Sequence, residues 1–80
     1  MNGTLDGTRH DAAWDAGDMG CGELVLELRF RMQELPAGAV LLLTALDPGA
    51  VEDIPAWCRM TRHRLVRAAH PRYWIARKED

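Results

Sequence analysis

The stretch AVLLLTALDPGAVEDIPAWCRM, Ala39 to Met60, decides the fold of this chain. Its first eight residues, Ala39–Leu46, form an almost continuous apolar run, as in a strand that is buried on both faces. Asp47, Pro48 and Gly49 then end the strand with turn chemistry, and Asp47 or a neighbour is a candidate cap for a helix over residues 50–62. Apolar side chains at three- and four-residue spacing predict the buried face of this helix, with Trp57 as its core anchor: Val51, Ile54, Trp57, Cys58 and Thr61.

The preceding segment, LVLELRFRMQEL at residues 24–35, is compatible with two structures. Leu26 to Met32 alternate between apolar and charged side chains, as in a half-buried strand. Twelve residues rich in Leu, Glu, Arg and Met are, however, long for a strand and ordinary for a helix. The sequence therefore predicts a helix whose buried face carries Val25, Leu28, Met32 and Leu35.

Further strands are predicted at both ends of the chain. RLVRAA at residues 64–69 and RYWIAR at residues 72–77 form a closing pair, and AAWDA at residues 12–16 forms a short first strand. A strand–helix–strand unit favours a parallel crossover. The order β-α-β-α-β-β predicts an α+β fold, a two-layer α/β sandwich with two helices on one face of a mixed four-stranded sheet. Residues 1–11 have little to bury and predict a flexible tail before a single domain at 12–80.

Composition restricts the class of protein. Eighty residues with 48% hydrophobic content make one small globular domain. Two cysteines are too few for a disulfide framework, which favours a reducing compartment. The N-terminus has no apolar signal-peptide core, and the longest apolar run is too short to span a bilayer. We therefore expect a cytoplasmic monomer without a membrane segment.

The net charge of −2 conceals an asymmetry along the chain. Seven acids lie before residue 40, whereas residues 59–78 contain six arginines, one lysine and no acid. Such a stretch can contact an acidic protein or a nucleic acid, or it can be a solvated surface. Adjacent Tyr73 and Trp74 are poorly placed for stacking on bases, since one of them is expected to face the core.

The sequence contains few groups suited to ordinary catalysis. His10, His63 and His70 form no tight pair with an acid, and no phosphate-loop pattern occurs. A zinc site is possible on ligand type alone, but no Cys-x-x-Cys or His-x-x-x-His spacing supports it; the candidate ligands are Cys21, Cys58, His63 and His70. We therefore expect neither a metal nor an organic cofactor.

Cys21 is notable for its position between Gly20 and Gly22, at the start of the first predicted helix. The positive end of a helix dipole lowers the pKa of a thiol and makes the thiolate available as a nucleophile. The alternative is a small buried side chain beside a turn. Cys58 lies on the apolar face of the second helix and is predicted to be a core residue.

A longer pattern bears on these alternatives. The chain contains Asp-Pro-x4-Asp-Ile-Pro-x-Trp-Cys-Arg-x3-His-x-Leu, from Asp47 to Leu65, and it resembles the TusA/SirA-like family of small sulfur-carrier proteins. The resemblance extends over residues 12–78, with family-like positions at Asp15, Cys21, Leu35, Gly38, Ile75 and Lys78. It implies the same β-α-β-α-β-β sandwich.

The resemblance also implies a function. Cys21 would be the catalytic cysteine, which accepts sulfane sulfur as a persulfide from a cysteine desulfurase or a rhodanese-like donor. It would pass the sulfur to an acceptor protein in tRNA thiolation, molybdenum-cofactor sulfuration or sulfur oxidation. No metal or organic cofactor is required. The basic residues Arg59, Arg62 and Arg64 are candidates for docking of these partners.

The chain departs from the family pattern around Cys21. The family motif Cys-Pro-x-Pro is Cys21-Gly22-Glu23-Leu24 here, so both prolines that would order the start of the helix are replaced. Asp18 and Glu23 bring negative charge near the thiol, which we expect to oppose thiolate formation. The near-site loop thus contains Asp18, Gly20, Gly22 and Glu23.

These departures from the family pattern have two consequences. The family's glycine before the histidine is Arg62, so we expect the second helix to end without a left-handed cap. Cys21 is either a sulfur acceptor with a less depressed pKa or a remnant in a divergent binding or regulatory module, one that contacts RNA or a protein through the basic C-terminal segment.

Overall fold

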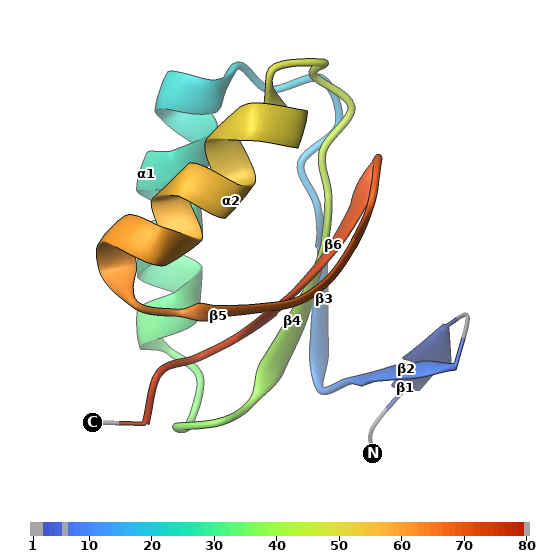
Figure 1. Cartoon of the computed structure of the whole chain (residues 1–80), viewed down its shortest axis with the longest axis vertical. Helices are drawn as coiled ribbons and strands as arrows, with labels where there is room; N and C mark the ends of the chain where they lie inside the picture. The colour runs from blue at the N-terminus through green and yellow to red at the C-terminus, as the bar shows by residue number, and fades with distance from the viewer. Residues whose placement is uncertain (1–2, 6, 80) are drawn as a thin grey trace.

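The computed structural model describes residues 3–5 and 7–79 (Figure 1). Within them, the elements in chain order are β1 (Gly3–Leu5), β2 (Thr8–His10), β3 (Ala12–Asp15), α1 (Cys21–Gln33), β4 (Val40–Thr44), α2 (Ala50–Thr61), β5 (Arg64–Ala69) and β6 (Arg72–Ala76). From β3 onward this is the predicted β-α-β-α-β-β order.

The main sheet is mixed, with the strand order β3-β4-β6-β5. β3 and β4 are parallel, with Trp14 opposite Leu43, while β6 is antiparallel to both β4 and β5. Figure 1 shows both helices on the same side of this sheet. The predicted α+β sandwich, including the parallel crossover through α1, is therefore confirmed.

The ambiguous segment is a helix. α1 fully buries Leu24, Leu28 and Met32, whereas Leu26 and Phe30 are 55% and 54% exposed. The segment forms a helix in spite of its strand-like alternation. A 13-residue helix can bury one residue every three or four against the sheet and leave its charged face in water. α1 begins at Cys21, three residues before the predicted helix, so Cys21 is its first residue.

α2 differs from its prediction in its buried face, which includes Ala50 but neither Val51 nor Thr61. Its buried residues are Ala50, Ile54, Trp57 and Cys58, so Trp57 and Cys58 are confirmed as core residues. Val51 is 53% exposed, and its predicted burial is wrong, because it lies outside the stripe that begins at Ala50. Of the predicted cap positions, Asp47 or a neighbour, the neighbour Gly49 is the N-cap residue, and no side chain caps the helix.

A small hairpin occupies the segment where the sequence predicts a tail. β1 and β2 pair antiparallel, with Leu5 opposite Thr8, and Gly7 has a φ of +80° at their connection. The sequence does not predict these strands because the segment offers few apolar residues to bury. The mobility of residues 1–11 and the domain boundary at residue 12 stay predictions.

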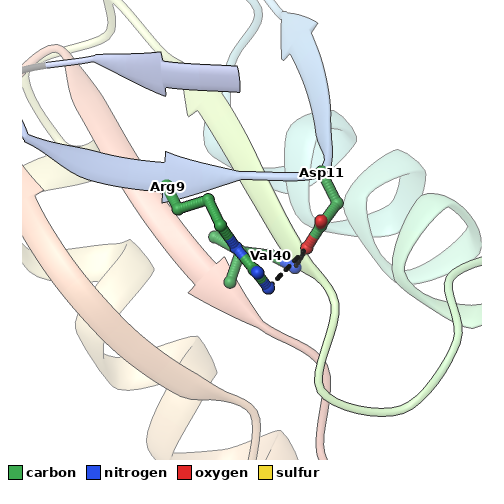
Figure 2. Close-up of polar contacts among 3 residues, drawn as sticks. All are labelled: Arg9, Asp11 and Val40. Atoms are coloured by element: carbon green, nitrogen blue, oxygen red, sulfur yellow. Dashed lines mark hydrogen bonds and ion pairs between the residues drawn. The ribbon is translucent and has the colours of Figure 1, made fainter. Parts of the chain in front are cut away.

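Asp11 connects this hairpin to the main sheet (Figure 2). The Asp11 backbone N–H donates to the Val40 carbonyl oxygen at 2.8 Å, and the Asp11 carboxylate accepts the Val40 backbone N–H at 2.9 Å. The guanidinium of Arg9 lies 3.7 Å from the same carboxylate oxygen. β2 is therefore held beside the start of β4.

The two central strands of the sheet, β4 and β6, are buried on both faces. The helix side of the sheet packs the main core, which includes Leu41, Leu43 and Tyr73 together with the buried faces of α1 and α2. On the other side Trp74 is fully buried with Val40, Leu42 and Ala76. The guanidinium of Arg67 lies 5.2 Å from the Trp74 ring, and Arg67 donates to Thr8 in β2. Both aromatic residues of the Tyr73–Trp74 pair are therefore buried, on opposite faces.

Candidate functional site

Cys21 is positioned by the loop between β3 and α1. Gly17 makes a left-handed turn with φ +60°, and its N–H donates to the Asp15 carboxylate at 2.9 Å. Gly20 is extended at the helix start, and its carbonyl accepts the Leu24 N–H at 2.8 Å. The Cys21 side chain is half-buried at the first position of the helix.

Two aspartates from another part of the chain lie beside the thiol. Cys21 Sγ donates a hydrogen bond to Asp47 Oδ2 at 3.0 Å. A Cβ atom placed on Gly49 would lie 3.0 Å from Asp47 Oδ2, 3.5 Å from Asp53 Oδ2 and 3.6 Å from Cys21 Sγ. The two carboxylates and the sulfur thus converge around Gly49, and the absence of a side chain there leaves room for them.

The carboxylates determine the protonation of the thiol. The pKa of Cys21 is raised from 9.0 to about 12. The largest cause is hydrogen bonding to Asp53, and hydrogen bonding to Asp47 is the next. Burial and the negative charges of Asp53 and Asp47 contribute less. The helix N-terminus alone would lower the pKa, so the expectation of a depressed value is wrong: two nearby acceptors outweigh the dipole. At neutral pH Cys21 is a thiol that donates to a carboxylate.

The near-site loop does not supply this negative charge. Asp18, Gly20, Gly22 and Glu23 are all exposed, and the influences on the pKa of Cys21 do not include Asp18 or Glu23. Asp47 and Asp53, the two aspartates of the longer motif, were missing from the predicted site. A sequence signal exists for them, because the loops after parallel strands β3 and β4 must meet at the same edge of the sheet.

An open groove of about 370 Å³, here called the cysteine groove, begins at this thiol. It is lined by Cys21, Gly22, Val25, Asp53, Ala56, Trp57 and Met60, so it runs between α1 and α2. Met60 is 75% exposed. The groove presents an apolar surface with a thiol and a carboxylate at one end and no cationic side chain in its lining.

Cys58 is a different kind of cysteine. It is 3% exposed in the main core, and burial raises its pKa to about 11, with only Arg59 acting in the opposite direction. Its predicted role as a core residue is confirmed.

The chain matches a family of sulfur-transfer proteins over most of its length. Residues 14–77 match the model described as Sulfurtransferase TusA. The chain belongs to the TusA family. It is 40% identical to a sulfur carrier protein TusA of Pseudomonas entomophila (strain L48) over 89% of this chain and 94% of that protein. It is 34% identical to a sulfur carrier protein TusA of Pseudomonas syringae pv. syringae (strain B728a), over 100% of both chains. It is 36% identical to one of Pseudomonas putida (strain W619), over 88% of this chain and 92% of that protein.

The structure accommodates both replaced prolines of the TusA motif. Leu24, at the second proline position, is fully buried in the main core. Gly22, at the first, is exposed, and a Cβ atom added there would meet nothing within 4 Å. α1 therefore gains apolar burial at one position and lacks the stiffening of a proline at the other.

Two of the predicted docking residues lie together in this TusA-family fold. Arg62 and Arg64 line a groove of about 510 Å³, here called the basic groove, with Arg77, Lys78, Gly38, Ala76 and Glu79. Arg59 is exposed but is not among these lining residues. A further hollow shares Arg62 and Lys78 with the basic groove, and it shares Trp57 and Met60 of α2 with the cysteine groove. The helix is about 18 Å long from its 12 residues.

Arg62 also corrects the expectation for the end of α2. It has φ +69° and ψ 12°, the left-handed conformation that the family's glycine would adopt without strain. The left-handed cap is thus retained by a residue that carries a side chain.

The described residues form neither a metal site nor a membrane-spanning helix. Among residues 3–5 and 7–79, no group of three or more His, Cys, Asp or Glu side chains could hold a metal ion, so the four candidate zinc ligands are not brought together. None of the helices in the same part of the chain has the length and apolar character needed to cross a membrane.

Proposed function

We propose that this protein carries sulfane sulfur as a persulfide on Cys21 and relays it to an acceptor protein. The observation that supports this most directly is the placement of Cys21 at the motif position, half-buried at the head of an open groove. The other cysteine, Cys58, is enclosed in the core. The family's sulfur-carrier members support the same role.

The transfer needs no metal and no organic cofactor. Cys21 Sγ attacks the outer sulfur of the donor's persulfide, the donor's sulfur–sulfur bond breaks, and the donor leaves as a thiol that takes up the Cys21 proton. The sulfur of an acceptor thiol then attacks the outer sulfur on Cys21, the sulfur–sulfur bond on Cys21 breaks, and the proton of the acceptor thiol passes to Cys21. The donor is a cysteine desulfurase or a rhodanese-like protein, and the acceptor acts in tRNA thiolation, molybdenum-cofactor sulfuration or sulfur oxidation.

Intact-mass measurement after incubation with a cysteine desulfurase and cysteine tests this function. The wild-type chain should gain the mass of sulfur atoms that reducing agent removes. Cys21→Ser should abolish the gain, while the matched variant Cys58→Ala should retain it. Wild-type protein that gains no sulfur under these conditions contradicts the proposal.

The basic groove is proposed as the docking surface for an acidic region of the donor or acceptor. Arg62, Arg64, Arg77 and Lys78 are among its lining residues, and the hollow that shares Arg62 and Lys78 with it also shares Trp57 and Met60 with the cysteine groove. A partner seated along α2 can therefore contact the cations while its reactive sulfur reaches Cys21.

The double variant Arg64→Glu/Lys78→Glu tests this docking. Loading by the desulfurase should slow by about tenfold or more, because two attractive charges become repulsive. Loading by a small persulfide such as glutathione persulfide should not change, and Arg9→Glu, in the hairpin, serves as the matched control. Equal desulfurase rates for the double variant and the control would exclude the basic groove as the docking surface.

The second candidate is a binding module that contacts RNA through the same cations. Tyr73 and Trp74 are both buried, so neither is available in the basic segment to stack on a base. An acidic protein partner is therefore favoured. RNA binding with a steep salt dependence, together with an unmodified Cys21, would support this second candidate instead.

A further inference from the structure

The two carboxylates beside Cys21 have opposite effects on the cysteine without sulfur (the empty state) and on the cysteine that carries a persulfide (the loaded state). In the empty state a neutral thiol donates to Asp47 at 3.0 Å, with Asp53 converging on the same place. In the loaded state the outer sulfur stands one sulfur–sulfur bond, about 2 Å, beyond Sγ. A persulfide ionises more readily than a thiol, because the S–H bond beside a second sulfur atom is weaker. The loaded site therefore brings a negative charge next to two carboxylates.

We propose, on the basis of the proposed function, that Asp47 and Asp53 bias the exchange at Cys21 toward release of sulfur. The exchange at neutral pH is Cys21–SH + R–S–S⁻ → Cys21–S–S⁻ + R–SH, where R–S–S⁻ is the persulfide of a donor thiol. One sulfur–sulfur bond breaks and one forms, the proton moves from Cys21 to the donor thiol, and no oxidant or reductant is needed. The carboxylates stabilise the left side by hydrogen bonding and destabilise the right side by repulsion.

The partial positive charge at the N-terminus of α1 acts in the opposite direction, and the two carboxylates outweigh it. Among the described residues that line the cysteine groove, none carries a cationic side chain. Tyr73 of β6 also interacts electrostatically with Cys21. Burial first, and then Cys21, raise the pKa of Tyr73. The Tyr73 hydroxyl lies 2.6 Å from His70 Nδ1. Tyr73 is therefore neutral near pH 7. The raised pKa of Cys21 agrees with the geometry, since it is attributed first to Asp53 and then to Asp47.

Asp47→Asn, Asp53→Asn and the double variant test the bias in two ways. The first measurement is persulfide occupancy at equilibrium with glutathione persulfide and glutathione, determined by intact mass. The second is the rate of iodoacetamide alkylation at Cys21 against pH, followed on the Cys21 peptide. Each single variant should raise the occupancy ratio and the neutral-pH alkylation rate by about tenfold, the factor for one pKa unit, and the double variant by more. The matched controls are Asp18→Asn and Glu23→Gln, which remove the same charge from the exposed near-site loop and should change neither quantity.

The outcomes distinguish the inference from the function on which it rests. A wild-type chain that never acquires sulfur contradicts the proposed function. A wild-type chain that acquires sulfur, with occupancy unchanged in all three aspartate variants, overturns the inference alone. Controls that act as strongly as Asp47→Asn also overturn it, because the effect would then be one of overall charge. Asp53 is exposed, so Asp53→Asn decides the question even if Asp47→Asn does not fold.

Discussion

At the scale of single residues, the site depends on contacts that neighbours in the sequence do not provide. Gly22 and Leu24 replace the motif prolines, but the ionisation of Cys21 is determined by Asp53 and Asp47. Two carboxylate acceptors keep the proton on the sulfur, whereas an unopposed helix N-terminus favours its loss. Whether Cys21 can accept sulfur therefore depends more on the two aspartates than on the missing prolines.

Arg62 supplies a prediction at the same scale. Replacing Arg62 by Gly should raise the free energy of unfolding by about 0.5–1 kcal/mol, because relief of the left-handed strain exceeds the added flexibility of the unfolded chain. Urea unfolding measures the change. Arg62→Ala removes the same charge but keeps the strain, so it should bring no gain. A gain of equal size in both variants would attribute the effect to charge instead.

At the scale of elements, His63 joins the end of α2 to the C-terminal segment. Its Nδ1 accepts the Lys78 backbone N–H at 3.0 Å, and its ring lies 5.4 Å from that of Trp57. Burial first, and then the positive charges of Lys78 and Arg77, lower the pKa of His63 below 6.5. The hydrogen bond requires neutral His63, because a protonated ring has no acceptor.

The lowered pKa predicts a loss of stability in acid. Since the unfolded chain binds the proton more readily, the contribution of His63 is complete above about pH 6.5 and decreases as the pH falls through the folded-state pKa. Urea unfolding from pH 7.5 to 4.5 measures this decrease. His63→Asn keeps an acceptor that does not titrate, so its stability should fall less than that of the wild type over this range. Parallel curves for the two proteins would contradict the assignment.

At the scale of the whole molecule, a second apolar cluster closes the helix-free face of the sheet. Trp74 is fully buried there, and the guanidinium of Arg67, which donates to Thr8 of β2, lies 5.2 Å from its ring. Its Nε1 is buried, and no hydrogen-bond partner for it occurs in the described part of the chain. The ring therefore stabilises the fold by apolar burial rather than by a polar contact.

Substitutions of Trp74 test this second cluster. Trp74→Ala should lower the free energy of unfolding by about 3–5 kcal/mol, because a large cavity would remain between the sheet and its cover. Trp74→Phe should cost less than half as much, since it keeps most of the apolar area and removes a buried N–H without a partner. Chemical denaturation of the three proteins measures both effects. Similar losses for the two variants would indicate that Nε1 has a partner in the folded protein.

The sequence by itself determined the element order, the mixed sheet with both helices on one face, the core position of Cys58 and the place of Cys21 at a helix start. These features follow from periodicity and turn chemistry, which act over a few residues. Only the tertiary structure decided the surroundings of Cys21 and the hairpin beside the start of β4. Asp47 lies 26 residues after Cys21 and reaches it because β3 and β4 are parallel and end at the same edge. The pKa of the thiol depends on distance in space, which local patterns do not encode.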